Sequence, residues 1–251
     1  MSNLFEEKYV VDELVHRGHQ FSISHGHCKN LGKKITINTV FNKPEDTLQE
    51  VNILKHVSHV PGVVMLLEHL KTGPNEHALI LERFSSVTLR KMLFQSGPLS
   101  ELVAAIIMKQ TVDTVQHLAA LNVVHKKLTP PNILVDLRTF RIKLTNFHTA
   151  GFFTSSILKG KVTNLTAPPE YYNDIPYNAE QHTVWNLGLL AFEMMHNKKA
   201  FSSLHDIQFA PVHINAPLSF DATIFVLGCL AKDPRQRPAL SHLNNHPWFY
   251  V

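Results

Sequence analysis

The sequence lacks the features that mark secreted and membrane-spanning proteins. Its 251 residues include only two cysteines, Cys28 and Cys229, far apart in the chain. A disulfide framework is therefore not expected, and a reducing compartment is. No apolar run approaches the ~18 residues of a membrane helix, and the acidic N-terminal stretch does not match a secretory signal. We expect a cytoplasmic protein, able also to enter the nucleus, with no membrane contact.

Strong charge of either sign is also lacking. The chain has 24 basic and 20 acidic residues, a net charge of +4, and 44% hydrophobic residues. This hydrophobic content excludes intrinsic disorder. The basic residues are scattered, so we expect no nucleic-acid partner.

Histidine, in contrast, is abundant, with 17 copies. Within thirteen residues the chain places four histidines and one cysteine, a composition that a zinc site could use. Their spacing matches no zinc motif, so we expect them at surface and turn positions and expect no metal site. These residues are His16, His19, His25, His27 and Cys28.

The first third of the chain has the periodicity of strands with one helix. Residues 35–40 alternate with strand period. Residues 42–46 contain a proline and two acids, which indicates the start of a helix. The short apolar runs 63–67 and 78–81 predict buried strands.

From about residue 86 the pattern changes to long helices. Ser100 and Glu101 predict a helix start, and residues 133–144 predict a β-hairpin. Asn178 and Gln181 have the spacing of a helix-capping pair. Strands followed by helices predict an α+β fold with two lobes.

Several motifs then follow one another in a fixed order, and this order resembles a eukaryotic protein kinase domain over essentially the whole chain. The Pim group of serine/threonine kinases is the most similar group. The resemblance implies one kinase-like domain, with a small β-rich N-lobe at 1–83 and a larger, mostly helical C-lobe at 84–251. We expect the domain to be complete between about Phe5 and Trp248. The motifs are His125-Lys126-Lys127, Asn132-Ile133-Leu134, Asn146-Phe147-His148, Pro168-Pro169-Glu170, Trp185-Asn186-Leu187-Gly188 and Arg237.

Four positions that the resemblance makes catalytic carry the wrong chemistry. Asn38 replaces the lysine that holds the nucleotide phosphates, and Thr129 replaces the lysine that steadies the moving phosphate. Lys127 replaces the catalytic base, and an ammonium group cannot accept a proton. Asn146 replaces the metal-binding aspartate, although magnesium prefers carboxylate oxygen. Phosphoryl transfer depends on such charges, so we expect it to be impaired.

Other positions match the family. Glu50 matches the helix glutamate but lacks its lysine partner, and the alternative is a solvated surface acid. Asn132 matches the metal-coordinating asparagine, and it could equally hold its own loop together by hydrogen bonds. Glu170 and Arg237 match a buried ion pair.

The resemblance also implies a degenerate nucleotide pocket. We expect no required cofactor, no metal, and weak, metal-independent ATP binding. Gly18 is the single family glycine retained in its loop, and an ordinary turn glycine is the alternative. The pocket residues are Gly18, Ile23, Thr36, Leu81, Glu82 and Leu134.

These substitutions predict a pseudokinase that acts in signalling by binding other proteins or as an allosteric or scaffold regulator. The alternative is a weak or unconventional ATP-dependent serine/threonine kinase. Arg90 and Lys91 lie without a neighbouring acid, so acidic or phosphorylated protein segments are the expected partners, and the alternative is that both are ordinary solvated charges. The stretch Thr154-Ser155-Ser156 offers sites for phosphorylation.

Overall fold

The chain divides into two compact units in the computed structural model, which describes residues 4–153, 157–158, 166–173 and 177–250. Unit 1 comprises residues 1–85 and 146–149, and unit 2 comprises residues 86–145 and 150–251. The sequence-based division after residue 83 did not place residues 146–149 with the first unit. An antiparallel sheet followed by a mostly helical region confirms the α+β class.

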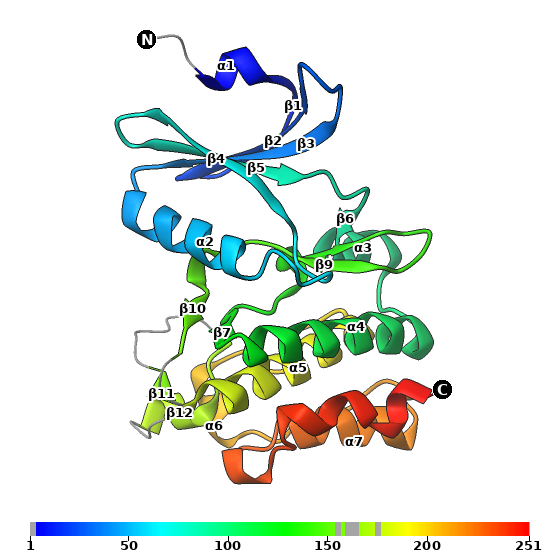
Figure 1. The fold of residues 1–251 in the computed structure, drawn as a ribbon. Coiled ribbons are helices and arrows are strands. Elements are labelled where there is room, and N and C mark those ends of the chain that lie inside the picture. The colour runs from blue at the N-terminus through cyan, green and yellow to red at the C-terminus, as the bar shows by residue number, and fades with distance from the viewer. Residues whose placement is uncertain (1–3, 154–156, 159–165, 174–176, 251) are drawn as a thin grey trace. The chain divides into compact units, whose positions relative to one another are not determined.

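Unit 1 is built on a five-stranded antiparallel sheet with the strand order β1-β2-β3-β5-β4 (Figure 1). The alternation of β3 places Ile35 and Ile37 on one face, where they pack with Ala78 and Ile80. Its elements are α1 (Leu4–Lys8), β1 (Tyr9–Arg17), β2 (Phe21–Cys28), β3 (Lys34–Phe41), α2 (Pro44–His56), β4 (Leu66–Gly73), β5 (Glu76–Glu82) and η2 (Phe147–Thr149).

Helix α2 begins where the sequence predicts, with Pro44 in its first turn and acidic residues beside it. The buried face of α2 includes an acidic residue, and one of its leucines is exposed. Leu48 is 46% exposed, whereas Glu50 is only 4% exposed. The face of α2 that packs against β4, β5 and η2 therefore carries a buried carboxyl group.

Strand β4 corrects one prediction, and β5 confirms another. The apolar run 63–67 is not a strand as a whole, because β4 begins at Leu66 and continues to Gly73. Val63 and Val64 are buried in the preceding connection instead, so their hydrophobicity reports burial and not strand structure. The predicted strand at 78–81 lies within β5.

Unit 2 is organised around α4 and α5, and the side chain of Trp185 on α5 is fully buried. Its elements are β6 (Val87–Thr88), α3 (Leu89–Ser96), α4 (Glu101–Ala120), β7 (Val123–Val124), η1 (Pro130–Asn132), β8 (Ile133–Val135), β9 (Ile142–Leu144), β10 (Gly151–Phe152), β11 (Ile157–Leu158), η3 (Pro169–Asn173), β12 (Tyr177–Asn178), α5 (Ala179–His196), α6 (Leu204–Phe209), α7 (Phe220–Cys229), η4 (Pro234–Gln236), η5 (Leu240–Asn245) and η6 (Pro247–Tyr250).

The helix starts of unit 2 follow local capping chemistry. Ser100 caps α4 by accepting a hydrogen bond from the Val103 amide. Asn178 caps α5 by accepting from the Glu180 amide, but Gln181 does not complete the predicted pair, because its side-chain oxygen is buried without a hydrogen-bond partner among the described residues. The hairpin of β8 and β9 forms as predicted.

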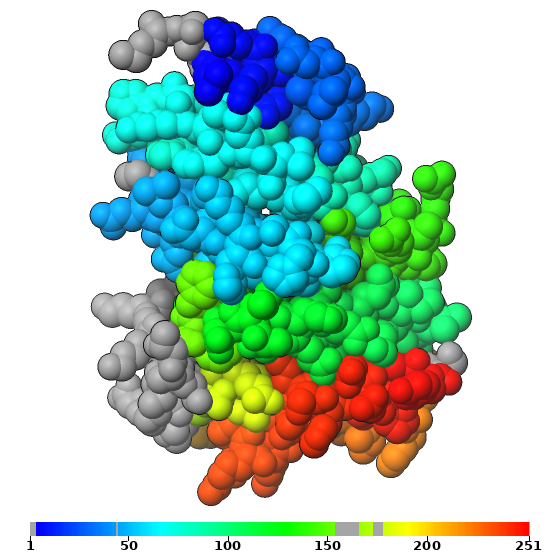
Figure 2. All heavy atoms as spheres, in the orientation of Figure 1, coloured from blue at the N-terminus to red at the C-terminus, as the bar shows by residue number. Residues whose placement is uncertain are grey.

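The C-terminal segment of unit 2 packs against α4. In Figure 2 the green band of α4 lies next to the red C-terminal residues. Gln116 of α4 donates a hydrogen bond to the Leu240 carbonyl at 2.6 Å. Nowhere in the described ranges is there a helix long and apolar enough to span a membrane.

The predicted ion pair between Glu170 and Arg237 is confirmed. Two parallel hydrogen bonds of 2.7 Å join the guanidinium to the carboxylate. Both side chains are buried, and the guanidinium also lies 5.0 Å from the ring centre of Trp185. The pair therefore ties the segment around η3 to the core of unit 2.

Candidate functional site

The predicted site residues fall into two sets, one in each unit. Unit 1 holds the positions on its sheet and α2, together with Asn146. Unit 2 holds the loop of residues 125–132 and strand β8.

Strand register brings four of the unit 1 positions onto one face of the sheet. Ile23 pairs with Asn38, and Thr36 pairs with Leu81. Since Ile35 and Ile37 face the opposite side, Thr36 and Asn38 share a face. The side-chain oxygen of Asn38 is buried and finds no hydrogen-bond partner among the described residues. A buried polar atom without a partner is costly, so Asn38 is poorly suited to its surroundings.

Glu50 is a buried acid, and the solvated-surface alternative for it is wrong. Its Oε1 accepts a hydrogen bond from the Phe147 amide at 2.8 Å. Burial raises the pKa of its carboxyl to about 7, although that hydrogen bond acts in the opposite direction. None of the ion pairs within the described residues includes Glu50.

Asn146 lies immediately before the residue that Glu50 holds. Its φ of +66° lies in the left-handed region, which asparagine tolerates better than most residues. Its side-chain oxygen forms a short hydrogen bond with Nδ1 of His148. The side chain at the family's metal-binding position is therefore engaged within its own turn.

The remaining unit 1 positions have structural partners. The Glu82 carboxylate accepts a hydrogen bond from the Met65 amide at 2.8 Å, and the Glu82 amide donates to the Met65 carbonyl. Gly18 lies in the turn between β1 and β2, where its amide donates to the Phe21 carbonyl. A Cβ at position 18 would approach the Phe21 ring to 2.8 Å, so a larger residue there would require this ring to move.

The loop of unit 2 is held by hydrogen bonds among its own residues. His125 donates from Nε2 to the Thr145 carbonyl at 3.1 Å and accepts at Nδ1 from the Lys127 amide at 3.3 Å. This pattern fits a neutral imidazole. Asn132 donates to the Lys127 carbonyl at 2.9 Å and to the Thr129 hydroxyl at 3.4 Å. Both hydrogen bonds use the amino group of Asn132, so they stabilise the loop and do not involve the oxygen that would coordinate a metal ion.

His182 is a buried titratable residue next to this loop, and the sequence analysis did not single it out. It is buried in α5, and its Nε2 lies 3.4 Å from the Lys126 carbonyl. Burial lowers the pKa of His182 to about 4, so the imidazole stays neutral and can donate to that carbonyl. Lys126 itself has a φ of +63°, and burial lowers the pKa of its ammonium. The sequence signal that could have identified His182 is a histidine within a largely apolar helix.

Three further predicted positions lie elsewhere in unit 2. Leu134 is half-buried on β8, opposite Thr88 and Lys143. Arg90 is not without an acid, because Glu193 of α5 binds it at 2.6 Å. Lys91 forms no ion pair with any described residue.

The N-terminal histidines contact acids of the neighbouring strand. His27 bonds Asp12 at 2.9 Å, and His25 lies 3.7 Å from Glu13. No group of three or more metal-binding side chains occurs within the part of the chain that the structure describes. Thr154, Ser155 and Ser156 lie outside the described residues.

The chain is similar to a known domain family and to several known proteins. The family model described as protein kinase domain matches residues 21–249. The chain is 27% identical to serine/threonine-protein kinase pim-2 of Danio rerio over 97% of its own length and 85% of that protein. It is 29% identical to serine/threonine-protein kinase prk-2 of Caenorhabditis elegans and 25% identical to the human SNF-related serine/threonine-protein kinase. These matches cover 81% and 96% of the chain but only 47% and 33% of those proteins. The chain belongs to the protein kinase domain family.

Proposed function

We propose that this domain is a pseudokinase, which transfers phosphate poorly and acts in signalling by binding other proteins or as an allosteric or scaffold regulator. The observation that carries the proposal is the pair Lys127 and Asn146, at the positions of the family's base and metal-binding acid. An ammonium at the first position holds a proton where one must be accepted. An amide at the second supplies no negative charge to a metal ion.

Magnesium, which the family implies, does not fit the available donors. It prefers carboxylate oxygens, and neither Asn132 nor Asn146 offers one. The Asn146 oxygen is already engaged with His148. We therefore assign no magnesium-dependent step to these residues.

Nucleotide binding, as proposed here, is weak and independent of metal. Its support is the apolar and small character of Ile23, Thr36 and Leu81, which share one face of the sheet of unit 1. ATP should raise the thermal midpoint slightly and equally with and without magnesium. The Asn146→Asp variant should bind more tightly when magnesium is present. A wild-type shift that requires magnesium would argue against metal-independent binding.

The proposed partners are acidic or phosphorylated protein segments, met in the cytoplasm or nucleus. Lys91 supports this proposal, whereas Arg90 is already paired with Glu193. Fluorescence anisotropy should show an acidic peptide binding more tightly than a basic peptide of the same length. Lys91→Glu should reduce that preference. An unchanged preference would show that Lys91 does not contribute to binding the peptide.

A weak serine/threonine kinase is the second candidate. The hydrogen bond from the Phe147 amide to Glu50 and the buried Glu170–Arg237 pair favour it, because both stabilise parts of the scaffold on which transfer would depend. The similar proteins named as serine/threonine kinases support the same possibility.

Radiolabel transfer from ATP to peptides or to the protein itself, with magnesium or manganese, separates the two candidates. The pseudokinase proposal expects the wild type and Asn132→Ala to give the same background signal. Wild-type turnover that disappears in Asn132→Ala would favour the kinase.

A further inference from the structure

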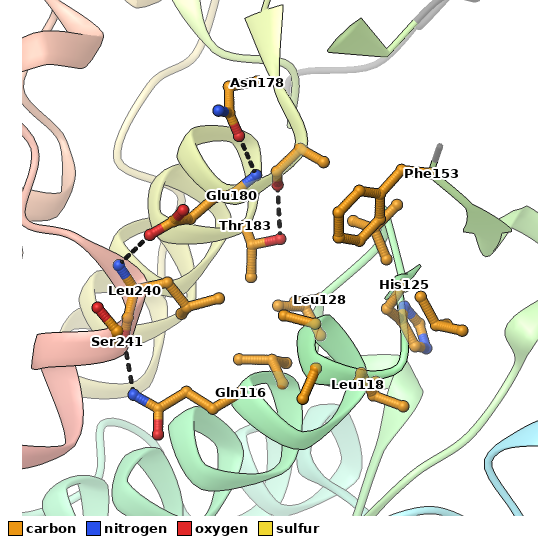
Figure 3. Close-up of a pocket in the computed structure, with 16 residues that line it drawn as sticks. Gln116, Leu118, His125, Leu128, Phe153, Asn178, Glu180, Thr183, Leu240 and Ser241 are labelled. Carbon is orange, nitrogen blue, oxygen red and sulfur yellow. Dashed lines mark hydrogen bonds between the residues drawn. The ribbon is translucent and has the colours of Figure 1, made fainter. Parts of the chain in front are cut away.

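Unit 2 contains a cavity of about 500 Å³ that none of the predicted catalytic or nucleotide positions lines. It lies between the last turns of α4, the loop after β7, the first turns of α5 and η5 (Figure 3). Its size falls within the range of small-molecule sites in proteins.

The cavity is apolar at one end and polar at the other. Leu118, His125 and Phe153 lie at one end in Figure 3, and Gln116, Glu180 and Ser241 lie at the other. Both ring nitrogens of His125 form hydrogen bonds with the backbone, so a ligand in the cavity would contact the carbon face of its ring. A ligand that fits must therefore be amphipathic, with an apolar body and one polar group.

The charge of the ligand's polar group follows from the residues that line the cavity. Among the described residues, Glu180 is the only acidic one that lines the cavity, and no described lysine or arginine lines it. One carboxylate oxygen of Glu180 accepts a hydrogen bond from the Leu240 amide at 2.7 Å. Glu180 has no ion-pair partner among the described residues. An ammonium group complements this wall, whereas a carboxylate would meet a like charge.

We propose that this cavity binds a small amphipathic amine, with its apolar body against Leu118 and Phe153 and its ammonium group beside Glu180. Apolar burial contributes most of the affinity, and Glu180 selects the charge of the polar group. Since His125 and Leu128 line the cavity, its occupant would contact the loop that carries Lys127.

Three probes of matched shape test the proposal on the full chain: 4-phenylbutylamine, 4-phenylbutanol and 4-phenylbutyrate. Methyl NMR should show the amine shifting the signals of the residues at the wall, and it should bind about tenfold more tightly than the carboxylate. The reporting residues are Val115, Leu118, Val123, Val124, Leu128 and Leu240.

Two variants distinguish the site from adventitious binding. Glu180→Gln keeps an acceptor for the Leu240 amide, so the fold should persist while the preference for the amine disappears and the alcohol binds as before. Ala119→Phe narrows the cavity and should weaken all three probes. Absence of binding, shifts at other residues, equal binding of amine and carboxylate, or an unchanged preference in Glu180→Gln would overturn the proposal.

Discussion

Glu50 is a buried acid that forms no ion pair with any of the described residues. Asn38 stands where the family resemblance places the lysine that would neutralise it, and the Asn38 oxygen is itself buried without a partner among the described residues. Glu50 is left with a hydrogen bond from the Phe147 amide and a pKa raised by burial. A buried acid without a cation favours its protonated form.

Glu50 should therefore make the protein less stable as the pH rises. The unfolded chain ionises this carboxyl near its ordinary pKa of 4.5, and the folded chain does so at about 7. Its contribution to stability is present below the lower value and lost as the pH rises through the higher one, by up to about 3 kcal/mol. Glu50→Gln keeps an acceptor for the Phe147 amide and should raise the thermal midpoint at pH 8 but not at pH 4.5. Glu45→Gln, on the exposed side of α2, is the control, and an equal effect there would contradict this account.

Asn38→Lys should return a cation to Glu50. At pH 8 we expect the substitution to stabilise the wild-type background and to destabilise the Glu50→Gln background, where the new ammonium would be buried without its acid. The coupling energy in this double-mutant cycle should be about 1–3 kcal/mol. Additive effects of the two substitutions would show that positions 38 and 50 do not interact.

At the scale of secondary-structure elements, the serines that cap α7 and α4 differ in the hydrogen bonds that they form. Ser219 joins two helices, because its hydroxyl accepts from the Ala222 amide of α7 and donates to Glu101 of α4 at 2.5 Å. Its amide also donates to Glu101. Ser100 caps α4 alone, through a longer hydrogen bond of 3.4 Å.

Ser219→Ala should therefore cost more stability than Ser100→Ala. We expect about 2 kcal/mol for Ser219→Ala, which loses a cap and a hydrogen bond to a charged acceptor. For Ser100→Ala we expect about 0.5 kcal/mol. Urea denaturation of the two variants measures the difference. Equal losses would mean that the Ser219–Glu101 contact contributes nothing.

Much of this element structure could be predicted from the sequence, because periodicity and caps are local. Residues 78–81, α4 and the β8–β9 hairpin are examples. The start of β4 and the burial of Glu50 could not be predicted, because tertiary packing decides which face of α2 is covered. At the site, motif positions identified Lys127 and Asn146. The hydrogen bonds of Asn132 and His182 depend on loop geometry that the sequence does not encode locally.

At the scale of the whole molecule, the buried ion pair between Glu170 and Arg237 is intact. Removing one partner of such a pair leaves an uncompensated charge in the interior. Glu170→Gln should therefore destabilise unit 2 by about 3–5 kcal/mol. Fluorescence of Trp185, which lies against Arg237, would follow the denaturation. Asp233→Asn breaks the exposed Arg235 pair and should change stability little, so a similar loss in both variants would contradict the role of burial.

The most direct measurement restores the missing charges and compares phosphate transfer in one assay. We expect transfer close to background from the wild type and clearly faster transfer from Asn38→Lys/Lys127→Asp/Asn146→Asp, since each introduced charge supplies a role in phosphoryl transfer. A wild-type protein that transfers phosphate as fast as the restored variant would contradict this account.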